Sequence, residues 1–306
     1  MKKIVLVASL ALSSALPAGC SQGGVSASIP NGLAAASAGS VLAPQPHYAP
    51  TIPAARAISP LSVYIPYHPG GIIIAQPKFY LIFWGYKKYG DPDKLQPLLE
   101  SYTQSMGGSS HNNIETQYYQ TIDGKTTYIA NPSNQYGGSW LDNAPIPKSP
   151  SDPDVAAQAL KGVAHFGYNA NGVYVVMTAH GHSEADFGTN WCSYHSNTYY
   201  GKKLVPYANL PYMPDAPAGK CGANSIQPPS DESGIDEGMT IFAGHEYGES
   251  ITDPDPYTAW YGVQGEIGDY CIAQDIQNDP FGSKSYTMQP MVSDATEACV
   301  QSYSPS

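Results

Sequence analysis

The chain has 306 residues, of which only 13% are charged, and its formal net charge at pH 7 is −11. It contains 24 tyrosines, 28 prolines and 30 glycines, a composition that favours a large aromatic core with long ordered loops. The acidic balance and the single arginine, Arg56, argue against a nucleic-acid-binding protein, because few cations are present to neutralise phosphates.

The first twenty residues have the pattern of an export signal. Two lysines precede the apolar run 4–12, and a small-residue processing site ends at Cys20. Gly19-Cys20 resembles the processing site of bacterial lipoproteins, although Pro17 stands where a leucine is usual, so ordinary cleavage near the same place is the alternative. The apolar run is too short for a transmembrane anchor. The sequence therefore predicts an exported protein, either secreted or lipidated at Cys20 and held at the outer surface or in the periplasm.

Two regions follow the export signal. Residues 21–60 are rich in Ala, Ser, Gly and Pro and carry one charge, so they bury too little apolar surface to fold and predict a disordered tether. Residues 61–306 have a length that suits a single globular domain.

Strands alternate with helices along this domain. Residues 78–85 are apolar on both faces and predict a central strand, and 172–178 predict a second buried strand. Helices are expected where apolar residues recur at helical spacing, and the first helix, at 95–106, ends at the glycine pair Gly107-Gly108. The alternation predicts an α/β fold with a mixed central sheet flanked by helices. The other expected elements are helices at 95–106 and 154–166, a short helix or strand at 113–119, a strand at 125–130 and a loop at 131–150.

Four cysteines remain if Cys20 is removed or lipidated. An even number in an exported chain predicts disulfides, and three pairings are open. We favour Cys192–Cys221 and Cys271–Cys299, because each would close a loop of roughly 30 residues that is rich in Pro and Gly. A thiolate zinc site is the competing interpretation, but no C-x-x-C spacing supports it.

The segment 239–255 combines an apolar helical pattern with a row of ionisable groups. His245 and Glu249 are four residues apart and share one face of a helix, and Asp253 continues the row at a helix end set by Pro254. An imidazole and a carboxylate one turn apart suit zinc. Glu246, beside His245, is the expected general base for a zinc-bound water. The segment thus resembles the H-E-x-x-H helix of zinc peptidases, with Glu in place of the second His.

Other polar residues are candidates for the same site. His180 and His182 follow the strand 172–178 and share one face of its extension, so either is a candidate to bind the metal or to support a residue that does. Glu266 and Asp269 stand in a Gly-rich turn, where they are candidates to support a metal ligand, solvated turn residues or, together with Asp253 and Asp255, ligands of calcium. His195 is expected to be structural.

Six short motifs are distributed over residues 64–299. They are Y-H-P-G-G at 67–71, F-Y-L-I-F-W-G at 79–85, V-Y-V-V-M-T at 173–178, D-F-G-T-N-W-C-S-Y-H at 186–195, T-D-P at 252–254 and E-I-G-D-Y-C at 266–271. Together they resemble the phosphate-induced/EXORDIUM-like family of extracellular proteins, and a bacterial branch carries a similar H-E-x-x-E pattern. The resemblance implies an extracellular location. Plant members look like cell-wall growth proteins without an established catalytic function.

Three functions are compatible with these patterns. The first is a zinc-dependent peptidase with a peptide or cell-surface polymer as substrate, in which His245, Glu249 and Asp253 bind the metal and His180 is the alternative third ligand. The second is a non-catalytic EXORDIUM-like surface protein that binds polysaccharide or a partner. The third is a metal-free hydrolase that uses paired carboxylates. Contact with a membrane is expected only through a lipid on Cys20.

Overall fold

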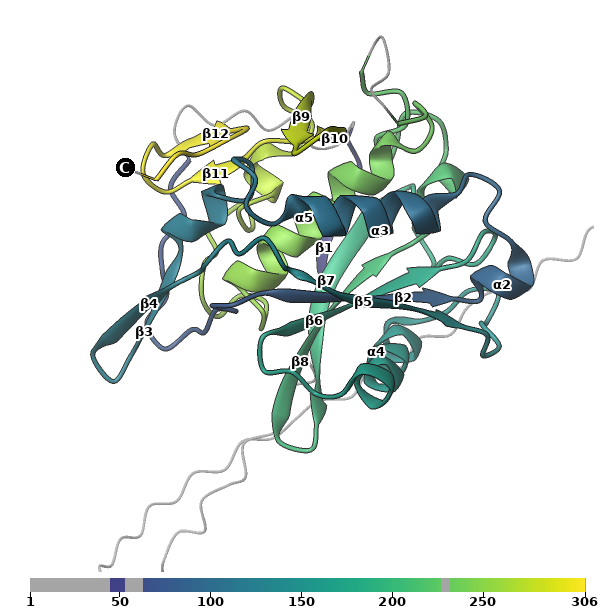
Figure 1. Ribbon diagram of the computed structural model, residues 1–306, viewed down its shortest axis with the longest axis horizontal. Helices are drawn as coiled ribbons and strands as arrows, with labels where there is room; N and C mark the ends of the chain where they lie inside the picture. Colours follow the sequence, from purple (N-terminus) through teal and green to yellow (C-terminus); the bar gives the residue numbers. More distant parts are fainter. Residues whose placement is uncertain (1–44, 53–62, 227–231, 306) are drawn as a thin grey trace, which may run out of the picture. The chain divides into compact units, whose positions relative to one another are not determined.

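A computed structural model describes residues 45–52, 63–226 and 232–305. Its central element is a six-stranded mixed sheet with the strand order β1-β7-β8-β6-β2-β5 (Figure 1). Strand β2 is parallel to β5 and to β6, and β6 is parallel to β8, whereas β7 is antiparallel to both β8 and β1. The strands are β1 (His47–Pro50), β2 (Lys78–Trp84), β5 (Tyr136–Asp142), β6 (Gly172–Thr178), β7 (Trp191–Tyr200) and β8 (Lys203–Leu210).

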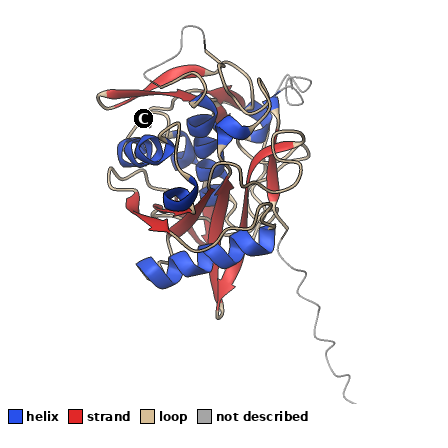
Figure 2. Ribbon diagram, turned by 90° about the vertical axis from the view of Figure 1, so that its right-hand side faces the viewer, coloured by secondary structure: helices blue, strands red, loops and turns tan. Residues whose placement is uncertain are grey.

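Helices cover both faces of this sheet. Helix α4 (Asp152–Phe166) lies on one face, and α3 (Leu95–Met106) and α5 (Glu237–Thr252) lie on the other (Figures 1 and 2). Helix α4 begins at a capping box, in which Ser151 and Asp154 satisfy each other's backbone N–H groups. Because helices cover both faces of the sheet, all seven residues of the central strand β6 are buried.

Helix α5 is buried along its whole length. Its glycines permit this, because they let other segments approach the helix closely. A Cβ atom at Gly244 would lie 2.3 Å from the terminal methyl of Met288, and one at Gly248 would lie 2.6 Å from that of Met291. The helix is therefore enclosed between the sheet and the C-terminal segments.

Smaller elements surround this core. Two-stranded antiparallel sheets are formed by β3 with β4, β9 with β10 and β11 with β12. Their bounds are β3 (Tyr119–Ile122), β4 (Lys125–Tyr128), β9 (Gln277–Phe281), β10 (Lys284–Met288), β11 (Met291–Ser293) and β12 (Ala298–Val300); the short helices are α2 (Tyr86–Tyr89), η1 (Ile114–Gln117), η2 (Met213–Asp215) and η3 (Asp269–Cys271).

Both predicted disulfides are present, Cys192–Cys221 and Cys271–Cys299. The first joins β7 to the segment before α5, and the second joins η3 to β12. Each bond closes a loop of nearly 30 residues, so together they restrict the unfolded chain over much of its C-terminal half.

The predicted α/β class with a mixed central sheet is confirmed. The central strand 78–85, the helix 95–106 and the strand 172–178 appear as β2, α3 and β6, and the helix of the segment 239–255 ends at Thr252 as expected. The prediction of a loop at 131–150 was wrong in its middle, where β5 pairs with β2. Strands β7 and β8 were not predicted, because polar residues at alternate positions of β7 are buried rather than solvent-facing.

The predicted tether 21–60 also needs correction. Residues 47–50 form β1, which pairs with β7 at the edge of the sheet and therefore belongs to the same compact unit. Composition missed it, because the pairing partner supplies the hydrogen bonds that so short a segment cannot make alone. The export signal 1–20, lipidation of Cys20 and the rest of the tether lie outside the described residues. Within the described ranges, no helix has the length and apolar character needed to cross a bilayer.

Stability should depend on the protonation of Glu115, a residue of η1 that is buried and has no hydrogen-bond partner at Oε2. Burial raises the pKa of Glu115 from 4.5 to about 7. Between these values the folded protein keeps a proton that the unfolded chain has released, so the free energy of unfolding should fall as pH rises through this window. Because glutamine stays neutral, the free energy of unfolding of Glu115→Gln should decrease by less over this pH range, by on the order of 3 kcal/mol.

Urea unfolding of both proteins at pH 4.5 and pH 7.5 measures the difference. The exposed residue Glu297 offers a matched control, and Glu297→Gln should leave the pH dependence unchanged. Equal pH dependence in the wild type and Glu115→Gln would contradict the prediction.

Candidate metal centre

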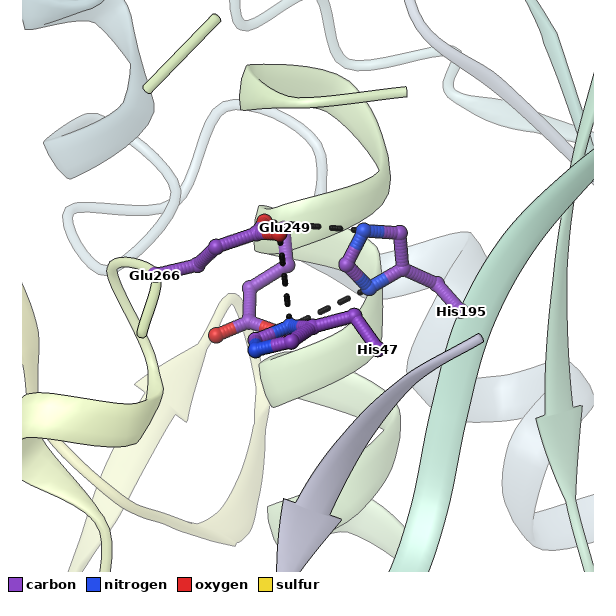
Figure 3. Close-up of side chains that lie close together, drawn as sticks. All are labelled: His47, His195, Glu249 and Glu266. Atoms are coloured by element: carbon purple, nitrogen blue, oxygen red, sulfur yellow. Dashed lines mark ion pairs between the residues drawn. The ribbon is translucent and has the colours of Figure 1, made fainter. Parts of the chain in front are cut away.

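Six ionisable side chains from four parts of the fold converge at one end of α5; we call them the ligand cluster. Strand β1 supplies His47, β7 supplies His195, α5 supplies His245 and Glu249, and the segment after α5 supplies Glu266 and Asp269. Figure 3 shows four of them facing one another. Their side chains are between 0% and 7% exposed, so bulk water does not solvate them. Charged groups buried this deeply need compensating partners.

Each of the three imidazoles has a defined partner on one ring nitrogen only. His245 Nδ1 lies 3.3 Å from Gln289 Oε1, His195 Nε2 lies 3.2 Å from the Asp253 carbonyl, and His47 Nε2 lies 3.0 Å from Asp269 Oδ2. The opposite nitrogens, His47 Nδ1, His195 Nδ1 and His245 Nε2, are buried and make no hydrogen bond. A neutral imidazole that donates from one nitrogen presents a lone pair on the other.

These three unpartnered nitrogens surround one carboxylate oxygen. Glu249 Oε2 lies 3.3 Å from His47 Nδ1, 3.6 Å from His195 Nδ1 and 3.2 Å from His245 Nε2, and it also lacks a hydrogen bond. Although these distances are within reach of a hydrogen bond, none of the four atoms makes one. Ligand atoms around a tetrahedral zinc ion with bonds of about 2.0–2.2 Å are separated by roughly 3.3–3.6 Å. The spacing therefore matches that of atoms which share a cation.

The carboxylates are held in place by backbone groups. Glu249 Oε1 accepts hydrogen bonds from the N–H groups of Gly268 and Asp269, and Asp269 Oδ2 accepts one from the N–H of Glu266. Both oxygens of Glu266 and Oδ1 of Asp269 are buried without a hydrogen bond. One oxygen of Glu249 and one of Asp269 are thus fixed by the chain, which leaves the second oxygen of each free to bind a cation.

Without a cation, protons must balance the charge of the cluster. Burial by itself would lower the pKa of His245, but Glu249 outweighs burial and raises it to about 10. Burial likewise lowers the pKa of His47, but Glu266 and Asp269 outweigh it, so the net shift is upward. Burial raises the pKa of Glu266, whereas His245 and His47 hold the pKa of Glu249 low in spite of burial. The raised pKa values keep His47 and His245 protonated beside ionised Glu249 when no cation is bound.

Glu246, the predicted general base, adjoins the cluster. Its Oε1 accepts a hydrogen bond from the Ser193 hydroxyl, and its Oε2 lies 3.3 Å from His195 Nδ1. Burial raises the pKa of Glu246. A carboxylate that holds a proton more readily than usual, next to the unpartnered nitrogen of His195, is placed to exchange protons within the cluster.

The structure does not bring Asp253, a predicted ligand, into the cluster. The side chain of Asp253 turns the other way and accepts hydrogen bonds from the N–H groups of Thr258 and Ala259, at 3.2 and 2.8 Å. The turn at Pro254 folds the chain back over this carboxylate. Only the carbonyl of Asp253 contributes, because it orients His195.

The two histidines after β6 also lie apart from the cluster. His180 Nδ1 is 2.6 Å from Asp215 Oδ1, and His182 Nδ1 is 2.8 Å from the Pro147 carbonyl. Neither joins a group of ligands. Glu266 and Asp269, in contrast, do enter the cluster.

Neither His47 nor His195 was predicted from the sequence as a member of the site, and His195 was expected to be structural. Strand β7 carried a usable signal, because Ser193, His195 and Asn197 alternate along one face. That face meets α5 and the segment after it, where the three residues contact Glu246, Glu249 and Asp255. His47 offered no comparable signal within a segment rich in Ala, Ser and Pro.

The comparisons with known proteins give one informative relative. The chain is 23% identical over 235 residues to protein EXORDIUM-like 5 of Arabidopsis thaliana, an alignment that covers 68% of this chain and 64% of the relative. The chain thus spans less than two thirds of that protein's length. No family model and no solved structure matches. The alignment supports a relationship to EXORDIUM-like proteins, as the motifs of the sequence indicated.

Gln289 should determine how well the centre binds a cation, because its Oε1 fixes the ring of His245 and its Nε2 donates to the Gly268 carbonyl. Loss of such a supporting hydrogen bond typically weakens metal binding 10–100-fold. We therefore expect Gln289→Leu to bind zinc about 10–100-fold more weakly, as measured by competition with a chromogenic chelator.

The control for this prediction is Gln277→Leu, at an exposed position of β9. Circular dichroism should show that both variants fold. An unchanged zinc affinity in folded Gln289→Leu would contradict a role for His245 as a ligand oriented by Gln289.

Proposed function

We propose that this protein is an exported, metal-dependent hydrolase that cleaves peptide bonds. The metal ligands would come from the cluster of His47, His195, His245, Glu249, Glu266 and Asp269, and Glu246 would act as the general base. Export is supported by the two disulfides, which form in oxidising compartments.

One observation carries this proposal. Three buried imidazole nitrogens face a buried carboxylate oxygen, and none of these four atoms has a hydrogen bond. Without a metal ion, these atoms are compatible only because His47 and His245 carry additional protons, and a divalent cation would replace those protons and bind the lone pairs of the imidazoles. In the described part of the chain no Lys or Arg lies within ion-pair distance of the cluster, so its carboxylates have no cationic side-chain partner other than these imidazoles.

The donor atoms favour zinc over calcium. Imidazole and carboxylate together suit zinc, whereas calcium takes six to eight oxygen ligands. When bound, such a cation supplies Lewis acidity and makes a water molecule more acidic. Peptide hydrolysis is the proposed reaction because a His-Glu pair on a helix, with a further ligand one turn on, is the arrangement that zinc peptidases use.

The chain's own residues would bind the substrate and move a proton. A surface cavity of about 370 Å³ lies beside the cluster, and its lining includes His47, Tyr257 and Asp269. Substrate would reach the centre from this side, where Asp269 and His47 are the slightly exposed members of the cluster. Glu246 would take a proton at Oε2, the oxygen that Ser193 does not occupy.

A second candidate is a non-catalytic extracellular protein in which the cation supports the fold. The nearly complete burial of the ligands favours it, because structural zinc sites are closed whereas catalytic ones keep an open position. The relationship to EXORDIUM-like 5 is compatible with this candidate too. It predicts metal binding without turnover.

Glu246→Gln separates the two candidates. If Glu246 is the base, the variant should keep its metal but lose about 10²–10⁴-fold in turnover of a peptide library. Glu297→Gln, at an exposed position, should keep wild-type turnover. Removal of metal with a chelator should abolish turnover, and added zinc should restore it.

The outcomes that contradict the hydrolase are distinct. Wild-type protein that binds metal and hydrolyses no peptide would favour the non-catalytic candidate. Full turnover in metal-loaded Glu246→Gln would overturn the role of Glu246. Turnover that survives complete removal of metal would favour a hydrolase that uses carboxylates alone.

A further inference from the structure

The ligand cluster is too spread to surround one ion. Its ligand atoms form two groups, and within each group they lie within 4.8 Å of one another. The first group is His47, His195, Glu249 and Glu266, and the second is His245, Glu249 and Asp269. Two ligands on opposite sides of one zinc ion, with bonds of up to 2.2 Å, are at most about 4.4 Å apart. Each group is near the size of one coordination sphere.

We propose that the protein binds two divalent cations, bridged by Glu249. One cation is bound by His47, His195, Glu249 and Glu266, and the other by His245, Glu249 and Asp269. The proposal rests on the metal centre of the proposed function and extends it from one ion to two. In hydrolases that use two metal ions, the two ions lie about 3.5–4 Å apart, and a carboxylate that binds both can bridge this distance.

Glu249 is placed to act as the bridge. Its Oε2 lies 3.3 Å from His47 Nδ1 in the first group and 3.2 Å from His245 Nε2 in the second, so the same oxygen faces both groups. Its Oε1 is turned away, toward the N–H groups of Gly268 and Asp269. The backbone thereby fixes the rotation of the carboxylate and directs Oε2 between the two groups.

The number of buried nitrogen and oxygen atoms that could bind a metal and that make no hydrogen bond also favours two ions. Three imidazole nitrogens and oxygens of Glu249, Glu266 and Asp269 are buried without hydrogen bonds. One four-coordinate zinc ion would leave at least two of these six residues unpartnered in a site that water does not solvate. Two ions that share Glu249 bind all of them.

The total charge of the buried carboxylates also favours two divalent cations. The cluster and its neighbour Glu246 contain four carboxylates, Glu246, Glu249, Glu266 and Asp269. When all four are ionised and the imidazoles are neutral, one divalent cation leaves a net charge of −2 in a buried site, and a second cation neutralises it.

The two positions differ in what they can do. The first group supplies four ligands, which fills the coordination sphere of zinc, as in structural sites. The second supplies three, which leaves one position for water or substrate, as in catalytic sites. The surface cavity is lined by one residue of each group, Asp269 of the second and His47 of the first, so substrate would approach both positions from this side.

Metal content per folded chain tests the proposal. After loading with zinc and removal of excess, the wild type should hold about two ions by elemental analysis. His47→Ala and His245→Ala, one from each group, should each hold about one. His180→Ala is the matched control, because this exposed histidine bonds Asp215 outside the cluster, and it should keep both ions.

Loading with Mn²⁺ gives a readout that does not depend on stoichiometry alone. Two Mn²⁺ ions about 4 Å apart couple magnetically, so the wild type should give a coupled electron paramagnetic resonance spectrum, and His47→Ala an uncoupled one. Circular dichroism establishes that the variants fold. If His47→Ala does not fold, Glu266→Gln removes a ligand of the same group with little change in volume.

The possible failures are distinguishable. One ion per wild-type chain, lost in both His47→Ala and His245→Ala, would overturn the two-ion centre and leave the hydrolase intact. Two ions without peptide turnover would support this inference and overturn the hydrolase. No bound metal at all would overturn both.

Discussion

This structure depends on one arrangement, in which three buried imidazoles face the buried carboxylate of Glu249. Each imidazole is fixed at one nitrogen and unpartnered at the other. The unpartnered nitrogens and Glu249 Oε2 lost their hydrogen bonds to water when the protein folded, and they gained none within the protein. They therefore need a partner of another kind, such as a proton or a metal ion. Their separations of 3.2–3.6 Å from Glu249 Oε2 are those of atoms around a cation.

Much of the surrounding architecture positions these side chains. The glycines of α5 let the helix lie enclosed between the sheet and the C-terminal segments, which places Glu249 away from solvent. The disulfide Cys271–Cys299 joins η3, which begins at Asp269, to β12. Strand β1 completes the edge of the sheet next to β7 and carries His47 to the cluster. Members of the cluster that are distant in sequence are therefore held by separate, well-anchored elements, as a pre-organised site would require.

The relationship to EXORDIUM-like 5 does not by itself decide between a hydrolase and a binding protein. The site adds information that the alignment lacks, because its chemistry follows from particular donors and their burial. Four side chains grouped without an open position would favour a structural ion, and three side chains beside a surface cavity would favour a catalytic one. The structure contains one group of each kind, so metal content and turnover must be measured separately.

The sequence alone determined the local features of this protein. Continuous apolar runs placed β2 and β6, apolar residues at helical spacing placed α3, and Pro254 placed the end of α5. Cysteine spacing gave both disulfides, and the four-residue spacing paired His245 with Glu249. Only the tertiary structure decided which distant residues join them. His47 lies about two hundred residues before Glu249 in the chain, and strand pairing at a sheet edge, which no local pattern encodes, brings the two together. The same is true of Asp253, whose helical spacing predicted a ligand, because the turn at Pro254 directs its carboxylate to Thr258 and Ala259 instead.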